Sequence, residues 1–114
     1  MFTLLSPDPI GGLEVKTRSG EWVAAPYIEH TLLVNIGDMF SRWTNDIFQS
    51  TPHRVLGKHH TDRYSVAMFY HLNADATVRC LPSCVPEGAA PKYEPIPYLE
   101  HLAFKFNQNL KAKF

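Results

Sequence analysis

The sequence predicts a mainly β fold, a sandwich or partial jelly roll that is closed by one C-terminal α-helix. Apolar runs such as those at residues 31–36 and 66–70 have the length of strands and are separated by turn-forming residues. The nine prolines of the chain favour many short elements, and a helical period that lasts for several turns is found near the C-terminus. Several short strands at close intervals favour this class over an alternating α/β fold.

With 114 residues, the chain is long enough for one modest core and too short for two domains. We expect a single, partial domain over residues 1–114, with a β-rich core at 1–80, a proline-rich loop at 81–97 and a C-terminal helix at 98–110. Apolar residues make up 45% of the sequence, which supports a packed core and argues against disorder.

The charge of the chain is balanced, with eleven lysines and arginines against eleven aspartates and glutamates. This balance favours small molecules or proteins as partners and argues against nucleic acid or a polybasic membrane anchor. The longest apolar runs fall far short of a membrane span, and residues 1–5 lack the basic lead of a signal peptide. We therefore expect no membrane insertion and a cytoplasmic location.

The first quarter of the chain predicts hairpins. Residues 2–5 have strand composition, and residues 6–12 are dense in turn formers. Residues 13–16 alternate apolar with charged side chains, as a strand with one solvated face does. Gly20 supplies a left-handed turn position before the return strand at 21–23.

The middle of the chain predicts a strand followed by a short helix. A β-rich run at 31–36 ends at Gly37, and Asp38 is a candidate N-cap for one or two helical turns. Three apolar side chains share one face of these turns, which is more typical of core packing than of a cofactor site: Met39, Phe40 and Trp43.

The second half predicts two further strands, at 63–70 and 77–80, joined to a helix by a proline-rich segment. Five prolines lie between Pro82 and Pro97, so no regular element is expected there. From Tyr98 the apolar period becomes helical, and Pro97 suits the first position of a helix that reaches about residue 110. The apolar stripe of this helix consists of Leu99, Leu102, Phe106 and Leu110.

Six short motifs occur in a fixed order along residues 1 to about 70. They are GGLEV at 11–15, GEW at 20–22, VNIGD at 34–38, RWTN at 42–45, STPHRV at 50–55 and DRYS at 62–65. In order and spacing they resemble the C-terminal half of the catalytic domain of the iron and 2-oxoglutarate dependent dioxygenases, in the isopenicillin N synthase-like branch. The resemblance implies a partial double-stranded β-helix, or jelly roll.

The resemblance implies that His53 is a metal ligand. The family holds its iron with two histidines and one carboxylate, which leave open positions for 2-oxoglutarate and oxygen. A strand presents alternate side chains to its two faces, so His53 can face the interior while Arg54 points away. Without the surrounding motifs, the favoured interpretation of His53 is a core histidine bonded to backbone.

Arg63 and Ser65 match the residues that bind the distal carboxylate of 2-oxoglutarate in the family. Their spacing of two places both side chains on one face of a strand, with Tyr64 on the other. A guanidinium can hold a carboxylate through paired hydrogen bonds, and a serine hydroxyl can add a third. The cofactors that the resemblance implies are therefore Fe(II) and 2-oxoglutarate, the latter as a cosubstrate.

The family's other two iron ligands form a His-x-Asp pair a few residues before the strand that resembles residues 2–5. We expect that pair upstream of Met1, so that this chain supplies one ligand of three. The tripeptide His-Thr-Asp at 60–62 matches the His-x-Asp pattern. It follows His53 in the sequence, however, whereas the family's pair precedes that histidine. His59 and His60 beside Lys58 are more typical of a solvated loop.

Other candidate ligands have structural interpretations. His30 and His71 lie where strands begin and end, and His101 lies off the apolar stripe of the final helix. Cys80 and Cys84 lack the two further ligands of a structural zinc site, and cytosolic thiols are normally reduced.

Two functional hypotheses follow. The first is an oxidoreductase that hydroxylates or desaturates a small organic substrate, with little activity in this chain alone because one histidine cannot hold Fe(II) usefully. The second is a non-catalytic, truncated paralogue that acts as a binding or structural module and self-associates through exposed strand edges. Chemistry without the cosubstrate is less favoured because Arg63 and Ser65 are present.

Overall fold

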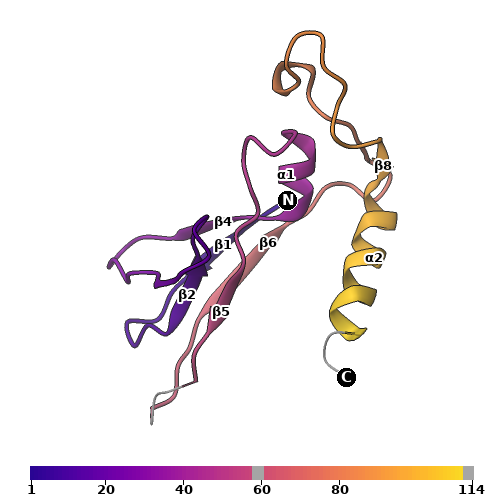
Figure 1. The fold of residues 1–114 in the computed structure, drawn as a ribbon. Coiled ribbons are helices and arrows are strands. Elements are labelled where there is room, and N and C mark those ends of the chain that lie inside the picture. The colour runs from indigo at the N-terminus through magenta and orange to yellow at the C-terminus, as the bar shows by residue number, and fades with distance from the viewer. Residues whose placement is uncertain (58–60, 112–114) are drawn as a thin grey trace.

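The computed structural model describes residues 1–57 and 61–111, with side chains up to residue 108 in the last helix. Within these residues the chain is mostly β, and a long helix, α2, forms its C-terminal end (Figure 1), which confirms the predicted class. In chain order the elements are β1 (Phe2–Ser6), β2 (Leu13–Lys16), β3 (Trp22–Ala24), β4 (Leu33–Ile36), α1 (Asp38–Trp43), β5 (His53–Val55), β6 (Val66–Tyr70), β7 (Thr77–Val78), the 3-10 helix η1 (Pro82–Cys84), β8 (Ile96–Pro97) and α2 (Tyr98–Lys111).

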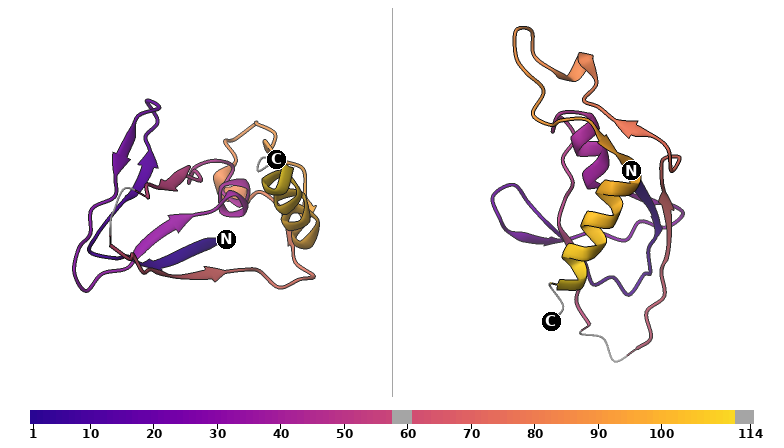
Figure 2. Two further views of the ribbon diagram at one scale, coloured as in Figure 1. Left: turned by 90° about the horizontal axis from the view of Figure 1, so that it is seen from below. Right: turned by 90° about the vertical axis from the view of Figure 1, so that its right-hand side faces the viewer.

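Two antiparallel sheets of three strands each face one another (Figure 2). In one sheet β1 lies between β4 and β6, and Thr3 is opposite Asn35 on one side and Phe69 on the other. In the other sheet β2 lies between β3 and β5, and Val15 is opposite His53. Because side chains alternate along each strand, this register decides which residues point into the space between the sheets.

The β2–β3 hairpin forms where the sequence predicts it. The Thr17 amide donates to the Glu21 carbonyl at 2.8 Å, and Gly20 has a φ of 91°, a left-handed conformation that glycine adopts without strain. On the outer face of this sheet, the Arg54 guanidinium lies 4.2 Å from the centre of the Trp22 ring. Trp22 therefore packs at the rim of the sheet and not in the core.

The prediction that Asp38 caps α1 is wrong. The N-cap residue is Gly37, which is extended and whose carbonyl accepts a bond from the Phe40 amide at 2.9 Å. Asp38 is the first helical residue, and its carboxylate pairs with Lys105 of α2 at 2.7 Å. Because the helix begins one residue earlier than predicted, Asp38 lies in its first turn, where a negative charge interacts favourably with the helix dipole.

The core lies between α1, β7 and the start of α2. Met39, Val78 and Tyr98 are each at most 4% exposed and contact one another. The prediction that α1 uses its apolar face for packing is confirmed for Met39, and Trp43 packs against the same cluster. The other partly buried members are Met1, Leu72, Ala76 and Leu102.

The prediction that the proline-rich segment holds no regular element is wrong, because the segment contains two short ones. The helix η1 begins with Pro82, where the missing proline N–H costs nothing. The strand β8 pairs with β7, with Pro97 opposite Thr77, and proline is tolerated there because the strand is short and at a sheet edge. Pro97 thus ends β8, and α2 begins one residue later, at Tyr98.

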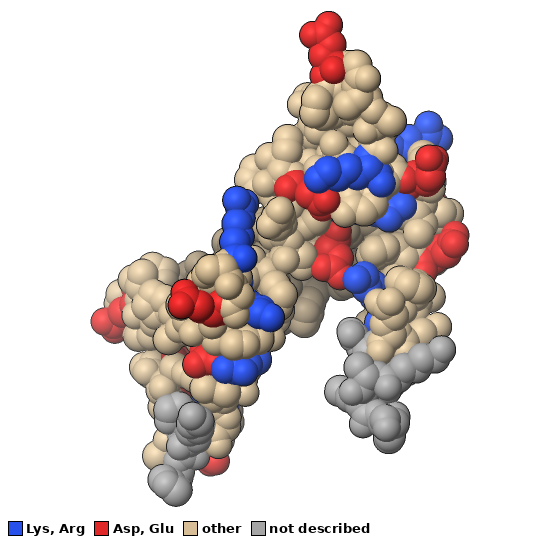
Figure 3. Space-filling model, in the orientation of Figure 1, with Lys and Arg blue, Asp and Glu red and all other residues tan. Residues whose placement is uncertain are grey.

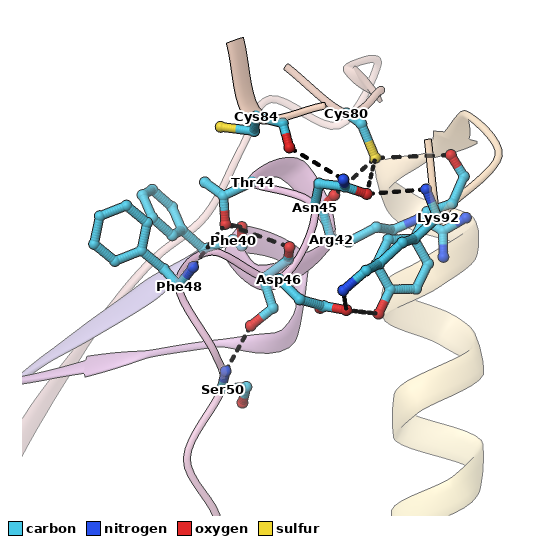
Figure 4. Close-up of polar contacts among 12 residues, drawn as sticks. Phe40, Arg42, Thr44, Asn45, Asp46, Phe48, Ser50, Cys80, Cys84 and Lys92 are labelled. Atoms are coloured by element: carbon cyan, nitrogen blue, oxygen red, sulfur yellow. Dashed lines mark hydrogen bonds and ion pairs between the residues drawn. The ribbon is translucent and has the colours of Figure 1, made fainter. Parts of the chain in front are cut away.

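The turn after α1 holds the proline-rich segment in place (Figure 4). Asn45 is 7% exposed, donates from Nδ2 to the Cys84 carbonyl at 3.1 Å and accepts from the Lys92 amide at 2.9 Å. Asp46 accepts from the Tyr93 hydroxyl at 2.9 Å. Asn45 and Asp46 have φ angles of 51° and 66°, and asparagine and aspartate tolerate this region better than most residues.

The described chain is open in shape, and acidic and basic side chains are interspersed on the face shown in Figure 3. Its radius of gyration is 16.4 Å, against roughly 13 Å for a compact chain of this length. In the predicted stripe of α2, Leu102 packs against the core, but Leu99 is 53% exposed and Phe106 is 60% exposed, so the stripe is only partly buried. None of the described helices is long and apolar enough to cross a membrane.

Candidate functional site

A cavity of about 220 Å³ lies between the two sheets and is lined mainly by apolar side chains. Its walls are the inward positions of the strands: alternate residues of β1, β4 and β6 on one side, and of β2 and β5 on the other. The lining residues are Thr3, Leu5, Leu13, Val15, Leu33, Asn35, His53, Val55, Arg63, Ser65, Ala67 and Phe69. All three residues that the motifs single out, His53, Arg63 and Ser65, therefore share one cavity.

His53 faces the cavity, and its neighbour Arg54 faces the other side of the sheet. The Nδ1 atom of His53 lies 3.2 Å from the Thr51 carbonyl. In the tautomer that protonates Nδ1, this atom donates to the carbonyl and leaves the Nε2 lone pair for a ligand. Arg54 pairs with Glu14 at 2.7 Å. The alternation of β5 thus separates a candidate metal donor from a structural ion pair.

Arg63 and Ser65 come just before β6, so the prediction that both lie within a strand is wrong. The strand begins at Val66. The two side chains nevertheless meet at one end of the cavity, because the spacing of two keeps them on one side of an extended chain. The Arg63 Nε donates to the Gly11 carbonyl at 2.6 Å, and Nη1 donates to the Ser65 hydroxyl at 3.2 Å.

The cavity brings together donors for a carboxylate and one ring nitrogen. Among the described residues, Arg63 forms no side-chain ion pair within 4.0 Å, and its guanidinium lines the cavity. The Ser65 hydroxyl lies within hydrogen-bonding distance of that guanidinium, and the two can bind one carboxylate together. His53 is the one histidine of the cavity lining, and no group of three or more histidine, cysteine, aspartate or glutamate side chains suited to a metal is found in the described residues.

Several residues of this site have no role in the sequence motifs. Thr3 and Asn35 are opposite one another in β1 and β4 and bring polar atoms to the cavity wall. The sequence could have indicated them only as residues on the inward face of two strands, and which face is inward is known only once the sheet register is known. Gly11 matters through its carbonyl, whose partner Arg63 lies 52 residues away in the sequence.

A second, larger cleft of about 680 Å³ lies between α1 and α2. His101, expected off the packed face of α2, is half-buried here, and its Nε2 is buried without a hydrogen-bond partner among the described residues. Burial, together with the nearby cations of Lys105 and Arg42, lowers the pKa of His101. Burial opposes ionisation of Asp38, but the hydrogen bonds from Lys105 and Ser50 outweigh it and leave the pKa of Asp38 below its usual value.

The remaining histidines and cysteines take structural positions. His30 lies in a turn with a φ of 60°, and His71 hydrogen-bonds through Nδ1 to the Tyr98 hydroxyl. Cys80 and Cys84 are free thiols, and Cys80 donates to the backbone carbonyl of Arg42 at 3.3 Å. Residues 58–60 lie outside the described residues, and with them His59, His60 and the start of the tripeptide at 60–62.

Two facing antiparallel sheets thus enclose a cavity that is lined by one histidine and by an arginine–serine pair. A family model described as the 2OG-Fe(II) oxygenase superfamily matches residues 1–72, well over half of the chain. The chain belongs to this superfamily, which confirms the family resemblance of its motifs.

Curated relatives cover most of the chain. Homoarginine-6-hydroxylase 2-ODD-233 of Oryza sativa subsp. japonica is 43% identical over 111 residues, which are 96% of this chain and 34% of the relative. The 2-oxoglutarate-Fe(II) type oxidoreductase hxnY of Emericella nidulans is 40% identical over 83% of this chain and 28% of its own length. The chain thus spans about a third of the length of these relatives.

Solved structures show the same arrangement. A full-length Neurospora crassa protein in complex with alpha-KG and thymine aligns with a TM-score of 0.83 and 36% identity, over 99% of this chain and 34% of that chain. The dioxygenase for auxin oxidation of rice aligns with a TM-score of 0.87 and 28% identity, over 96% and 38% of the two chains. The predicted jelly-roll fold is confirmed by these similarities.

Proposed function

We propose that the chain forms part of the active site of an Fe(II)- and 2-oxoglutarate-dependent dioxygenase that hydroxylates or desaturates a small organic substrate. One observation carries the proposal: His53, Arg63 and Ser65 line a single cavity between the two sheets. The membership of the superfamily supports it, and so does the alpha-KG in the crystals of the Neurospora crassa protein.

Each residue has a distinct role in this proposal. Arg63 and Ser65 bind the distal carboxylate of 2-oxoglutarate, with Arg63 oriented by its bond to the Gly11 carbonyl. His53 would hold Fe(II) through Nε2 in the tautomer whose Nδ1–H donates to the Thr51 carbonyl. Fe(II) and 2-oxoglutarate together supply the oxidising chemistry. The rest of the cavity wall is mainly apolar, so few other groups compete with Arg63 and Ser65 for the carboxylate.

A binding experiment tests the proposal on this chain. We expect 2-oxoglutarate to shift amide resonances of the cavity strands in a saturable way, and the Arg63→Gln variant to lose these shifts. Equal shifts in both proteins, or none in either, would contradict the proposed site. Little turnover is expected from this chain alone, since His53 is a single donor. Tight, His53-dependent binding of Fe(II) or Mn(II) in calorimetry would overturn that expectation.

A second candidate function is a non-catalytic binding or structural module that self-associates. One observation favours it: the outer face of the β4-β1-β6 sheet is apolar and exposed, with Val66 72% exposed and Met68 53% exposed. Strand β6 is also an edge of that sheet, and its free backbone groups can pair with another strand. The occupant we propose for this surface is a second copy of the chain.

We propose a cytoplasmic location for the protein. The proposal is supported by the two cysteines, Cys80 and Cys84, which are both free thiols, as is usual in a reducing compartment.

A further inference from the structure

The turn between β1 and β2 contains a buried carboxylate, Asp8, that is only 8% exposed. Its Oδ1 accepts a hydrogen bond from the Ile10 amide at 2.7 Å, and its backbone carbonyl accepts one from the Gly11 amide at 3.0 Å. The first bond closes an Asx-turn and the second closes a β-turn with Pro9 at its second position, where the fixed φ of proline is favourable. One carboxylate oxygen is thus used inside the turn.

The other oxygen reaches a distant segment. Oδ2 of Asp8 accepts a hydrogen bond from the Tyr64 amide at 2.7 Å, across 56 residues of sequence. Tyr64 lies between Arg63 and Ser65, so the bond fixes the backbone between the two side chains of the proposed carboxylate site. The same turn also supplies the Gly11 carbonyl that accepts from the Arg63 Nε at 2.6 Å.

The chemistry of the contact requires a carboxylate. Both oxygens of Asp8 face an N–H donor, and an ionised carboxylate is the only side-chain head group of this size that accepts at both positions. Asparagine would place an NH₂ group against one of the two amides and leave a buried donor unsatisfied. Burial strengthens both bonds, because little water competes for the carboxylate.

We propose that Asp8 is a positioning residue for the 2-oxoglutarate site, which holds Arg63 and Ser65 in the geometry that grips the distal carboxylate. The inference rests on the proposed function, since it gives Asp8 its role through the Arg63–Ser65 pair. Asp8 itself lies outside the residues that line the cavity, so its effect on the ligand passes through the backbone at Tyr64 and the Gly11 carbonyl.

The test compares 2-oxoglutarate affinity in variants of the full chain, measured by amide shift titration. We expect Asp8→Asn to weaken binding by about tenfold, the effect of losing one hydrogen bond that orients a charged group. Asp75→Asn is the matched control, because Asp75 lies in an exposed turn away from the cavity, and it should bind as the wild type does.

Asp8→Ser separates the local turn from the long-range contact. A serine hydroxyl can still accept from the Ile10 amide and keep the turn, but it is too short to reach Tyr64 as well. We expect Asp8→Ser to weaken binding as Asp8→Asn does, with unfolding midpoints that show both proteins folded. If Asp8→Asn fails to fold, the affinity of Asp8→Ser for 2-oxoglutarate tests the positioning role.

Combination with Arg63→Lys, which should keep measurable affinity, distinguishes positioning from general stability. In the Arg63→Lys background, Asp8→Asn should weaken 2-oxoglutarate binding by less than it does in the wild type, because the Arg63 geometry that Asp8 holds is already lost. If the wild type binds in an Arg63-dependent way while both Asp8 variants bind equally tightly, the positioning role is wrong and the proposed function stands. If the wild type does not bind 2-oxoglutarate, both the proposed function and this inference fail.

Discussion

His53 and Arg54 are neighbours in β5 and lie on opposite faces of the β3-β2-β5 sheet. His53 lines the cavity between the sheets, while Arg54 stacks on the Trp22 ring and pairs with Glu14. Two adjacent residues of one motif therefore have separate tasks, one in the site and one in the sheet that carries it.

This relationship predicts opposite outcomes for two adjacent substitutions. Weak Mn(II) binding by the wild type should broaden amide resonances near His53, and His53→Ala should abolish this broadening because the nitrogen donor is lost. Arg54→Ala should keep the broadening and lower the free energy of unfolding by about 1 kcal/mol, since it removes a cation–π contact and a partly exposed ion pair. Broadening that survives in His53→Ala would exclude His53 as the donor.

The carboxylate site predicts that charge alone is insufficient at position 63. Arg63→Lys keeps the positive charge but loses the bond from Nε to the Gly11 carbonyl and the planar fork, so we expect about tenfold weaker binding of 2-oxoglutarate. Ser65→Ala should weaken binding less, by about threefold to tenfold, since it removes one hydrogen bond. Arg18→Lys, in the exposed hairpin turn, is the control in shift titrations. Wild-type affinity in Arg63→Lys would show that the fork is not used.

Local patterns in the sequence predicted those elements that local interactions determine. The β2–β3 hairpin follows from alternation and from the conformational freedom of Gly20, both of which are readable within a few residues. The inward direction of His53 likewise follows from strand alternation.

Tertiary contacts decided the features that the sequence did not predict. Asp38 does not cap α1, because the helix begins at Asp38 itself, and its carboxylate pairs with Lys105 of α2. The strand β8 forms because it pairs with β7, although the prolines of the segment disfavour a strand locally. Asp8 has its long-range partner at Tyr64, and no local pattern indicates that contact.

The turn after α1 predicts a specific cost for changes at Asn45. Asn45→Ala leaves the Cys84 carbonyl and the Lys92 amide without their side-chain partner and puts an alanine at a φ of 51°. We expect a loss of about 3 kcal/mol in the free energy of unfolding, measured with denaturant, and faster proteolysis of segment 85–92. Asn45→Gly loses the same hydrogen bonds without the backbone strain, and should be about 1 kcal/mol more stable than Asn45→Ala. Equal stabilities would argue against the strain.

The cleft between α1 and α2 predicts a pH dependence that comes from His101. The pKa of His101 is lowered from 6.5 by burial and by the cations of Lys105 and Arg42, while Asp38 opposes the shift. At pH values between the lowered pKa of His101 in the folded chain and 6.5, the unfolded chain binds more protons than the folded chain. The contribution of His101 to stability is therefore fully present above pH 6.5 and is lost as the pH falls to the pKa of the folded chain. The pKa of Asp38 is lowered from 3.8, so its contribution is lost only in more acidic solution.

Thermal unfolding at pH 7.5 and 5.5 measures this effect. We expect the midpoint of the wild type to fall by about 2 °C more than that of His101→Gln over this interval, since the glutamine does not titrate. His30→Gln is the control, because the His30 side chain is 89% exposed, and its pH dependence should match the wild type. The same pH dependence in His101→Gln and wild type would assign the effect to another group.

The exposed outer face of the β4-β1-β6 sheet predicts self-association. Met68 points away from the cavity from the edge strand β6, so Met68→Lys puts a charge on the apolar face without touching His53 or Arg63. We expect sedimentation velocity to show concentration-dependent association of the wild type and about tenfold weaker association of Met68→Lys. Ser19→Lys adds the same charge in the exposed hairpin turn and should associate as the wild type does. A wild type that remains a monomer at high concentration would contradict the surface assignment, because an apolar edge strand that stays unpaired in solution has no affinity for a second copy.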